Sequence, residues 1–439
     1  MQTTIEVIIQ ILGIIGTVIG LCGAYRIIFV VVGLLKVKKF PKAQKQHTYG
    51  ICIAARNEEK VIRNLLESIL NQDYPQDKLR VFVVADNCTD NTAQIVKDFA
   101  AENNLTNISL YEHNNPDERT KGFALKYLFE RIKDDFTIDG YEGYFVFDAD
   151  NVLHPDYITR MNEAFDAGKK IVTSFRHSKN IHRNWISFGY GIYWMTTSLY
   201  ENRAKGVLDQ ACRIQGTGYL FAAEIVKDGW NYTRLTEDRA FCTDAVIKNH
   251  KISYCDDAVF YDEQPYKLKV ALRQRLRWAK GHLQSFAEFG PSLFKNLFSR
   301  HKNFCITWDM LWINFPRTIE SAFRRWLTWL LRIIIFAIIG TNFFTNVWQV
   351  IVFAYLMDRV SFWFSEMFKG VITMIWYHKR LGKPPFWKTI FHVFMFPLFS
   401  EIGRWCSYVA LFKKVEWKPI PHDTVMDIGA LNQNADTTK

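Results

Sequence analysis

Several common patterns are missing from this sequence of 439 residues. It has no G-x-G-x-x-G and no G-x-x-x-x-G-K-S/T motif, so a dinucleotide-binding fold and a P-loop ATPase would each lack their phosphate cradle. Its eight cysteines lie far apart, with no C-x-x-C pair and no histidine at zinc-binding spacing, so we interpret them as reduced thiols. A second large domain is not expected, because single hydrophobic cores stop growing near ~250–300 residues.

Positive charge is in excess. Lysine and arginine number 55 against 44 for aspartate and glutamate, which gives a net charge of +11. Such a surface suits an anionic membrane or a phosphorylated substrate as well as it suits a nucleic acid. Charge alone therefore selects no partner.

A long apolar tract near the N-terminus predicts a membrane span. Residues 7–35 are interrupted by few polar side chains, and a spanning helix needs roughly 20 apolar residues. Five lysines follow directly, whereas the only charged side chain before the tract is Glu6. The positive-inside rule then places the N-terminus outside and the chain after Lys36 in the cytosol, with residues 1–45 forming a span and a basic linker.

Further apolar stretches lie near the other end of the chain. The stretches 326–344 and 347–368, divided by a turn at Thr345–Asn346, predict a transmembrane hairpin within residues 326–377. Charges inside the second stretch, such as Asp358, would have to face protein and not lipid. Within 378–412, the apolar run from Phe386 to Phe412 is interrupted by Pro397, Glu401 and Arg404, which favours an interfacial helix, with a further span as the alternative. A cytosolic tail follows over residues 413–439, in a multi-pass plasma-membrane protein.

Between these segments, residues 46–264 predict a cytosolic α/β domain. Short apolar strands alternate with helices, which is the pattern of a parallel or mixed sheet. Ligands of such sheets bind at the carboxyl ends of the strands, so the residues there are the first candidates for a site. The predicted strands are 49–54, 79–85, 108–112 and 144–147, and the predicted helices are 58–71, 91–103 and 121–133.

Polar clusters follow three of the predicted strands: Arg56-Asn57-Glu58, Asp86 to Asp90, and Asp148-Ala149-Asp150. Asp148 and Asp150 flank one alanine, so in an extended chain both carboxylates project to the same side. Oxygen ligands of this kind hold Mg²⁺ or Mn²⁺ together with phosphates. A polar turn at the end of a strand is the alternative interpretation.

Two later motifs carry further candidates. In Thr236-Glu237-Asp238, Asp238 is our candidate for the base that takes a proton from an attacking hydroxyl. The alternative is a helix N-terminus that Thr236 caps and the two acids stabilise. Gln274-Arg275-Leu276-Arg277-Trp278 supplies guanidinium groups for a diphosphate and an indole for a sugar ring. A basic helix at the bilayer surface, with Trp278 as its anchor, explains the same residues.

In this order the motifs resemble the family 2 glycosyltransferases of the hyaluronan, chitin and cellulose synthase type. The likeness covers about residues 49–281 and also rests on Lys121-Gly122-Phe123-Ala124-Leu125 and Gly216-Thr217-Gly218. It implies a GT-A (Rossmann-like) domain, followed by interfacial helices over residues 265–325. It further implies metal-dependent, inverting transfer of a sugar from a UDP-sugar to a growing β-linked polysaccharide.

The resemblance also implies roles for particular residues. Arg56, Glu58, Asp86, Lys121, Asp148, Arg275 and Arg277 would bind the nucleotide-sugar, and Asp148 and Asp150 the Mg²⁺ or Mn²⁺. Thr236, Glu237 and Asp238 would form the catalytic motif, and Gly216, Thr217, Gly218, Gln274 and Trp278 would bind the acceptor. Trp417, Lys418 and His422 stand where these synthases carry a gating loop.

Other functions share many of these features. A non-processive enzyme that glycosylates a lipid carrier is the first alternative, and a catalytically inactive basic membrane scaffold is the second. UDP-glucose is favoured as donor over UDP-N-acetylglucosamine. Three membrane crossings are few for enclosing a polymer path, so we expect either a homo-oligomer or a path completed by interfacial helices. The expected partners are a UDP-sugar, a polysaccharide acceptor and the lipid bilayer, with no nucleic acid.

Overall fold

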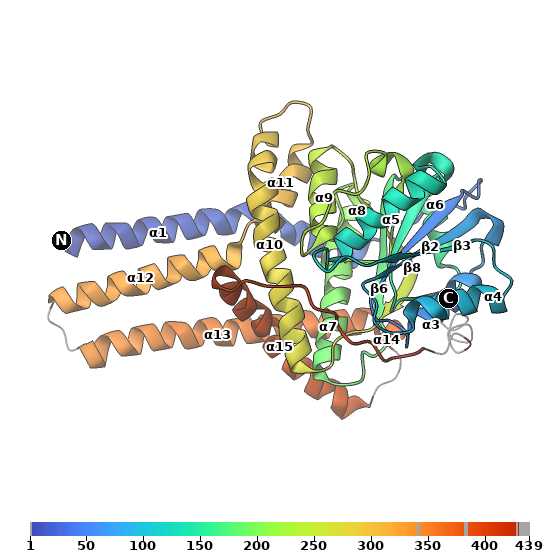
Figure 1. Ribbon diagram of the computed structural model, residues 1–439. Coiled ribbons are helices and arrows are strands. Elements are labelled where there is room, and N and C mark those ends of the chain that lie inside the picture. Colours follow the sequence, from blue (N-terminus) through green and yellow to red (C-terminus); the bar gives the residue numbers. More distant parts are fainter. Residues whose placement is uncertain (1, 340–342, 382–384, 427–428, 430–439) are drawn as a thin grey trace.

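The computed structural model describes residues 2–339, 343–381, 385–426 and 429. Figure 1 shows an α/β domain from which three long helices extend. The domain is built on an eight-stranded mixed sheet with the order β3-β2-β1-β4-β7-β6-β8-β5. Its strands are β1 (Tyr49–Ala55), β2 (Leu79–Asp86), β3 (Ile108–His113), β4 (Gly143–Asp148), β5 (Val152–Leu153), β6 (Ile171–Ser178), β7 (Tyr219–Ala222) and β8 (Ser253–Asp262).

Strand β1 lies between β2 and β4 in the parallel part of the sheet. It pairs in parallel with β2 and β4, and β2 pairs in parallel with β3. Strand β7 runs antiparallel to both β4 and β6, which makes the sheet mixed. The predicted α/β class is therefore confirmed, and each of the four predicted strands agrees with an observed strand to within one residue at either end.

Helices cover both faces of this sheet and enclose two apolar cores. Side chains alternate along β1, so that Ile51 and Ile53 enter one core and Cys52 enters the other. The first core is covered by α3 (Ile62–Leu70), α4 (Thr92–Glu102) and α6 (Tyr157–Asp166). The second is covered by α5 (Lys121–Asp135), α7 (Trp185–Thr197) and α9 (Glu237–Ile247).

One predicted helix begins later than expected. We predicted a helix from Glu58, whereas α3 begins at Ile62. The backbone N–H of Glu58 donates to Thr92 Oγ1 at 2.8 Å, and that of Glu59 donates to the Asp90 carboxylate at 3.1 Å. Residues 58–61 therefore form a turn tied to the loop after β2, and this turn presents the Glu58 side chain at the strand ends.

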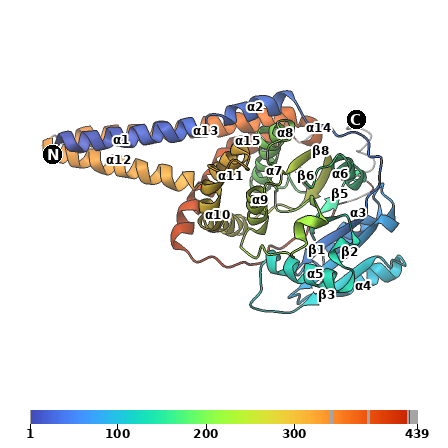
Figure 2. The same cartoon turned by 90° about the horizontal axis from the view of Figure 1, so that it is seen from above.

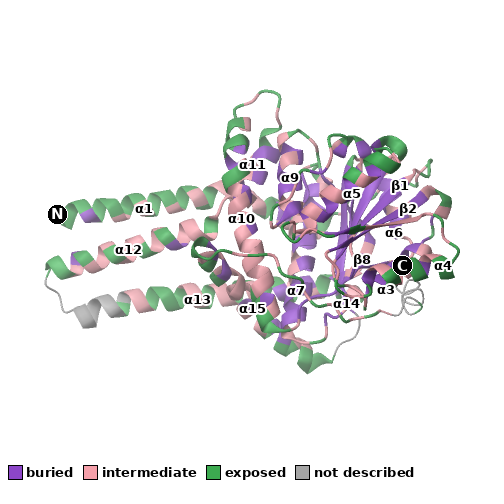
Figure 3. Ribbon diagram, viewed as in Figure 1, coloured by how far each residue is buried: buried purple, intermediate pink, exposed green. Residues whose placement is uncertain are grey.

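The remaining helices lie mainly on the side of the domain from which the three long helices extend. In Figures 1 and 2, α1, α12 and α13 run side by side away from the domain. Much of their surface is exposed in Figure 3, and the exposed side chains include Leu21, Phe323 and Phe353. The bounds are α1 (Gln2–Cys22), α2 (Arg26–Leu35), α8 (Arg203–Val207), α10 (Leu268–Asn296), α11 (Phe304–Asn314), α12 (Arg317–Ile339), α13 (Phe343–Trp376), α14 (His378–Leu381) and α15 (Phe386–Phe412).

The N-terminal tract, predicted as a span over residues 7–35, forms two consecutive helices, α1 and α2, joined by a turn at residues 23–25. Among the described residues, the helical stretch 2–35 is the one long and apolar enough to cross a membrane. The chain turns after Cys22, and the 21 residues of α1 at 1.5 Å each reach about 31 Å, close to the hydrocarbon thickness of a bilayer. Helix α2 instead packs on the domain, where Arg203 Nε donates to the Gly33 carbonyl at 3.0 Å.

The predicted hairpin also has a different boundary. Thr345 and Asn346, predicted as the turn, belong to α13, which begins at Phe343, whereas α12 ends at Ile339. The charged residues predicted to lie inside the second stretch have partners on neighbouring helices. Arg325 pairs with Asp358 at 2.8 Å, and Arg359 reaches Glu401 of α15 at the same distance.

Two glycines of the N-terminal helices offer a matched test of this packing. A Cβ at Gly33 would overlap the carbonyl oxygen of Leu199, whereas a Cβ at Gly13 would have no neighbour within 4 Å. We expect Gly33→Ala to destabilise the protein by about 1–3 kcal/mol, because α2 must move off the domain. Gly13→Ala should leave the midpoint unchanged or raise it. Thermal unfolding of both variants in the same detergent checks this, and equal midpoints would contradict the packing of α2.

Candidate functional site

The carboxyl ends of β1, β2 and β4 form one wall of a pocket of about 170 Å³, called here the strand-end pocket. The structure brings all but three of the predicted site residues to this pocket. Its lining contains Arg56, Glu58, Asp86, Lys121, Asp148, Asp150, Gly216, Thr236, Glu237, Asp238, Gln274, Arg277, Trp278, Trp417, Lys418 and His422.

Arg56 links the end of β2 to the C-terminal tail. Its guanidinium is ion-paired with the buried Asp86 carboxylate, and its Nε donates to the Asp86 carbonyl at 2.9 Å. The ring of Trp417 lies 4.7 Å from the guanidinium carbon. His113 Nδ1 lies 2.9 Å from the same Asp86 carboxylate.

The two acids after β4 are held in different ways. Asp148 is ion-paired with Lys121, whose Nζ also donates to the Gly216 carbonyl at 2.9 Å. Asp150 is only 4% exposed and accepts a hydrogen bond from the Glu263 backbone N–H at 2.9 Å. Asp148 therefore faces the pocket beside a lysine, while Asp150 lies deeper.

Thr217 and Gly218, predicted to bind an acceptor, lie behind the pocket and hold this loop. The Thr217 hydroxyl accepts from the Asp148 backbone N–H at 2.8 Å and donates to Asn151 Oδ1 at 2.5 Å. Gly218 has a φ of +66°, and a Cβ there would overlap the ring of Phe260. Of the three residues, Gly216 alone lines the pocket.

The acids after β4 have the donor atoms for part of a metal site. Among the described residues, no three His, Cys, Asp or Glu side chains are grouped so that they could hold a metal ion by themselves. Mg²⁺ and Mn²⁺ are often bound by one or two carboxylates together with substrate phosphates and water. Asp148 and Asp150 fit that donor set, with a diphosphate supplying the other oxygens.

The tail enters the pocket through His422. Its Nδ1 lies 2.9 Å from Glu58, and its Nε2 lies 3.9 Å from Asp150. Burial alone would lower the pKa of His422, but the carboxylates of Asp150 and Glu58 raise it to about 10, so the ring is an imidazolium. Burial raises the pKa of Glu58 to about 7, and the His422 charge opposes that rise.

Sequence reasoning missed Glu263, which fixes the tail. Its carboxylate accepts from the backbone N–H groups of Asp423 and Thr424 at 2.9 and 2.8 Å. Glu263 directly follows β8. The polar residues at the end of this strand, like those after β1, β2 and β4, could have identified it from the sequence. The predicted tail residues beyond Met426, apart from Gly429, lie outside the described residues.

The Thr236-Glu237-Asp238 motif stands at the start of α9. Thr236 occupies the N-cap position, but its side chain accepts no hydrogen bond from the helix, so it is not the cap that the alternative interpretation requires. Burial raises the pKa of Glu237 to about 7, with Lys121 opposing the rise. Glu237 is only 5% exposed, whereas Asp238 is half-buried and reaches a second cavity as well.

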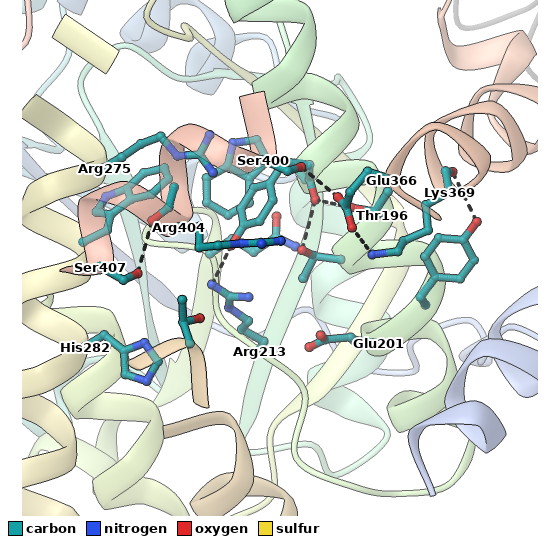
Figure 4. A pocket seen from close by; sticks show the side chains of 18 of the residues that line it. Thr196, Glu201, Arg213, Arg275, His282, Glu366, Lys369, Ser400, Arg404 and Ser407 are labelled. Atoms are coloured by element: carbon teal, nitrogen blue, oxygen red, sulfur yellow. Dashed lines mark hydrogen bonds and ion pairs between the residues drawn. The ribbon is translucent and has the colours of Figure 1, made fainter. Parts of the chain in front are cut away.

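This second cavity, called here the membrane-side cavity, has a volume of about 840 Å³ (Figure 4). Thr236, Asp238 and Trp278 line both spaces and form part of the wall between them. Trp278 packs edge-on against Trp194, with ring centroids 5.4 Å apart.

Arg275 lines the membrane-side cavity and not the strand-end pocket, which separates it from the other residues predicted to bind the nucleotide. Its Nη1 donates to the Phe399 carbonyl of α15 at 2.6 Å, and its guanidinium carbon lies 3.9 Å from the Phe399 ring. Arg275 and Arg277 are two residues apart on a helix and therefore do not face the same side. Arg277 and Trp278 lie three and four residues after Gln274, and they share one face with it.

A sequence model of glycosyltransferase like family 2 matches residues 47–281, more than half of the chain. The chain belongs to this glycosyltransferase family. The matched region begins just before β1 and ends within α10. It therefore includes the whole sheet and every residue of the strand-end pocket except those of the C-terminal tail.

Several curated members of the family are similar in sequence. A probable glycosyltransferase YdaM of Bacillus subtilis is 26% identical over 59% of this chain and 59% of its own length. A beta-monoglucosyldiacylglycerol synthase of Nostoc is 25% identical over 60% and 54%, respectively. A poly-beta-1,6-N-acetyl-D-glucosamine synthase of Staphylococcus epidermidis is 26% identical over 57% and 59%. The chain thus spans little more than half of the length of these relatives.

A solved structure shares the architecture. The mannosyltransferase PcManGT from Pyrobaculum calidifontis, in complex with GDP-Man and Mn²⁺, matches with a TM-score of 0.56 and 16% identity. The match covers 91% of this chain and 99% of that one. At this identity it establishes the fold, which is the GT-A fold.

The different placement of the two arginines of α10 can be tested directly. Arg277→Ala should lower the affinity for UDP by at least tenfold, because a guanidinium that lines the strand-end pocket is lost next to the acids. Arg275→Ala should change UDP affinity little. Titration calorimetry with UDP and Mn²⁺ checks both, and equal losses in the two variants would contradict the separation seen here.

Proposed function

We propose that the protein is an inverting glycosyltransferase that transfers a sugar from a UDP-sugar to an acceptor hydroxyl delivered from the membrane side. One observation carries the proposal: Asp238 lies in the wall between the strand-end pocket and the membrane-side cavity. A donor on one side and an acceptor on the other would meet at its carboxylate.

The residues of the pocket support this chemistry. Asp238 would take the proton of the acceptor hydroxyl as its oxygen forms a bond to the anomeric carbon, while the bond from that carbon to the diphosphate breaks. Arg277, which donates to the Leu235 carbonyl at 2.8 Å, has further N–H groups for the departing diphosphate, and Lys121 lies beside Asp148 for the same charge. Asp148 and Asp150 would hold Mg²⁺ or Mn²⁺, which neutralises the diphosphate when it is bound.

The closed tail supports a role for residues 413–426 in retaining the donor. Trp417, Lys418 and His422 complete the lining of the strand-end pocket. Trp417 makes a cation–π contact with Arg56, and His422 makes a polar contact with Glu58. A displaced tail would exchange both contacts for water. We propose that this segment covers the nucleotide during transfer.

A growing β-linked polysaccharide, formed from UDP-glucose or UDP-N-acetylglucosamine, is the acceptor that the resemblance implies. The position of Trp278 in the wall beside Asp238 supports it, because an indole face can hold a terminal sugar. Transfer to a lipid is the second candidate. It is favoured because residues of α2, α12, α13 and α15 line the membrane-side cavity, and α12 and α13 are two of the long helices that extend from the domain. In both cases we propose a multi-pass plasma-membrane protein with α1, α12 and α13 as crossings.

Replacing the proposed base tests the function. Purified wild-type protein should release UDP from a single UDP-sugar in the presence of acceptor, and Asp238→Asn should lower kcat by ~10²–10⁴-fold while the affinity for UDP stays the same. The product of the wild type, sized by mass spectrometry, separates a polymer from a single lipid-linked sugar. Wild-type kcat in Asp238→Asn would show that another group takes the proton.

Removing the metal is an independent test. EDTA should abolish UDP release, and added Mg²⁺ or Mn²⁺ should restore it, because the diphosphate would otherwise meet the Asp148 and Asp150 carboxylates without a cation between them. Asp150→Asn should raise the Mn²⁺ concentration needed for half-maximal rate. Full turnover of wild-type protein in EDTA would remove the metal from the mechanism.

A further inference from the structure

The membrane-side cavity carries a large excess of positive charge. Its lining contains seven lysine and arginine side chains against three acidic ones. The basic residues are Arg26, Arg213, Arg239, Arg275, Arg317, Lys369 and Arg404, and the acidic residues are Glu201, Asp238 and Glu366. Figure 4 shows Arg213, Arg275 and Arg404 around one part of the cavity and Glu366 with Lys369 at another.

Three of these cations already have acidic partners. Arg26 is ion-paired with Glu201, Lys369 with Glu366, and Arg404 lies 3.6 Å from Glu401. The other four have no carboxylate within ion-pairing distance in the part of the chain that the structure describes; they are Arg213, Arg239, Arg275 and Arg317.

Neutral groups hold these four guanidinium groups only in part. Arg213 donates to the Tyr193 hydroxyl at 3.0 Å, and Arg239 makes two long contacts of 3.4 Å with Ile313 and Asn314. Arg317 is exposed at the start of α12, over the ring of Trp312. Each of these arginines has N–H groups left for a ligand.

The charges of Arg213 and Arg239 affect the pKa values of groups in the same part of the cavity. Burial and the charge of Arg213 lower the pKa of Arg239. Burial and the charge of Arg239 lower the pKa of His282 to about 3, so this histidine is neutral in the cavity. Several unpaired cations close together are costly, and a bound anion would relieve their repulsion.

The position of the cluster indicates where such an anion would sit. Arg239 follows Asp238 in sequence, and the Asp238 charge acts on both Arg213 and Arg239. On the other side, the cavity shares Arg317 and Arg404 with a further space of about 920 Å³ between α1, α12, α13 and α15. That space is lined by charged side chains such as Arg324 and Asp358 as well as by apolar ones, and a ligand that spans both spaces would place its anion near the base and its remainder between α1, α12 and α13.

We propose that the membrane-side cavity binds the phosphate group of a lipid acceptor through Arg213, Arg239 and Arg317. Arginine suits a phosphate because its planar guanidinium donates two parallel hydrogen bonds to it. A neutral glycan would leave the charge of the cluster uncompensated. The inference rests on the proposed function for the identity of the acceptor site, and it favours a phosphate-bearing lipid as the molecule that enters it.

A binding experiment tests this without any turnover. The full-length protein in a neutral maltoside detergent is titrated with phosphatidic acid, with diacylglycerol of the same acyl chains, and with inorganic phosphate, and binding is followed by native mass spectrometry. Phosphatidic acid should bind at least tenfold more tightly than either of the others. Equal binding of diacylglycerol would overturn the phosphate contact, and equal binding of inorganic phosphate would overturn the lipid.

Variants assign the binding to the cluster. Arg213→Gln and Arg239→Gln should each weaken phosphatidic acid binding by about tenfold, whereas Arg213→Lys should retain part of it. Arg131→Gln, which removes an exposed cation paired with Asp134 on α5, is the matched control and should leave binding unchanged. UDP affinity is measured in every variant to show that the domain is folded, and unchanged lipid binding in folded Arg213→Gln and Arg239→Gln would overturn the proposal.

Sugar transfer and the phosphate site can be refuted independently of each other. A wild-type protein that binds phosphatidic acid as expected but releases no UDP from any UDP-sugar would refute sugar transfer and leave the phosphate site standing. A wild-type protein that releases UDP normally but shows no preference for phosphatidic acid would refute the phosphate site alone.

Discussion

Negative charge gathers at the carboxyl edge of the sheet and must be balanced by positive charge from other segments. Asp86 meets Arg56 from the end of β1, Asp148 meets Lys121 from the start of α5, and Asp150 with Glu58 meets His422 from the tail. Moving an ion from water into a protein interior costs several kcal/mol unless it is paired. The buried acids therefore hold three separate segments against the strand ends, and the pocket exists because these segments converge there.

A second charged network sets the position of the N-terminal helices. The Tyr25 hydroxyl donates to Asp309 of α11 at 2.7 Å, and the fully buried Lys205 of α8 pairs with the same carboxylate at 2.6 Å. Arg26 adds the ion pair with Glu201. Tyr25 and Arg26 stand at the junction of α1 and α2, so their contacts with these acids fix α2 against the domain. The N-terminal helices and the α/β domain are therefore joined through polar contacts.

The sequence was most informative where a pattern is local. The strands and the polar residues after them were predicted correctly, because alternation and chain adjacency are enough to place a side chain at a strand end. The start of α3 was missed because helical periodicity runs on through a turn that contacts with Thr92 and Asp90 impose. The separation of Arg275 from Arg277 was not foreseen because the motif was treated as one unit, although its residues face two sides of α10.

The unpaired arginines could not have been found in this way. Arg213 precedes β7, Arg239 lies on α9 and Arg317 begins α12, so no spacing in the sequence joins them. Only the packing of α7, α9, α10 and α12 brings them to one cavity. Their convergence bears on the choice between a polymer and a lipid acceptor. A processive enzyme must let its product slide by one sugar after each transfer, whereas a cluster of fixed cations holds an anion in one place. If the anion stays bound, a product that lengthens moves its reactive end away from Asp238. A phosphate site beside the base therefore suits a single transfer, or the first transfer onto a primer, better than the repeated extension of a neutral chain.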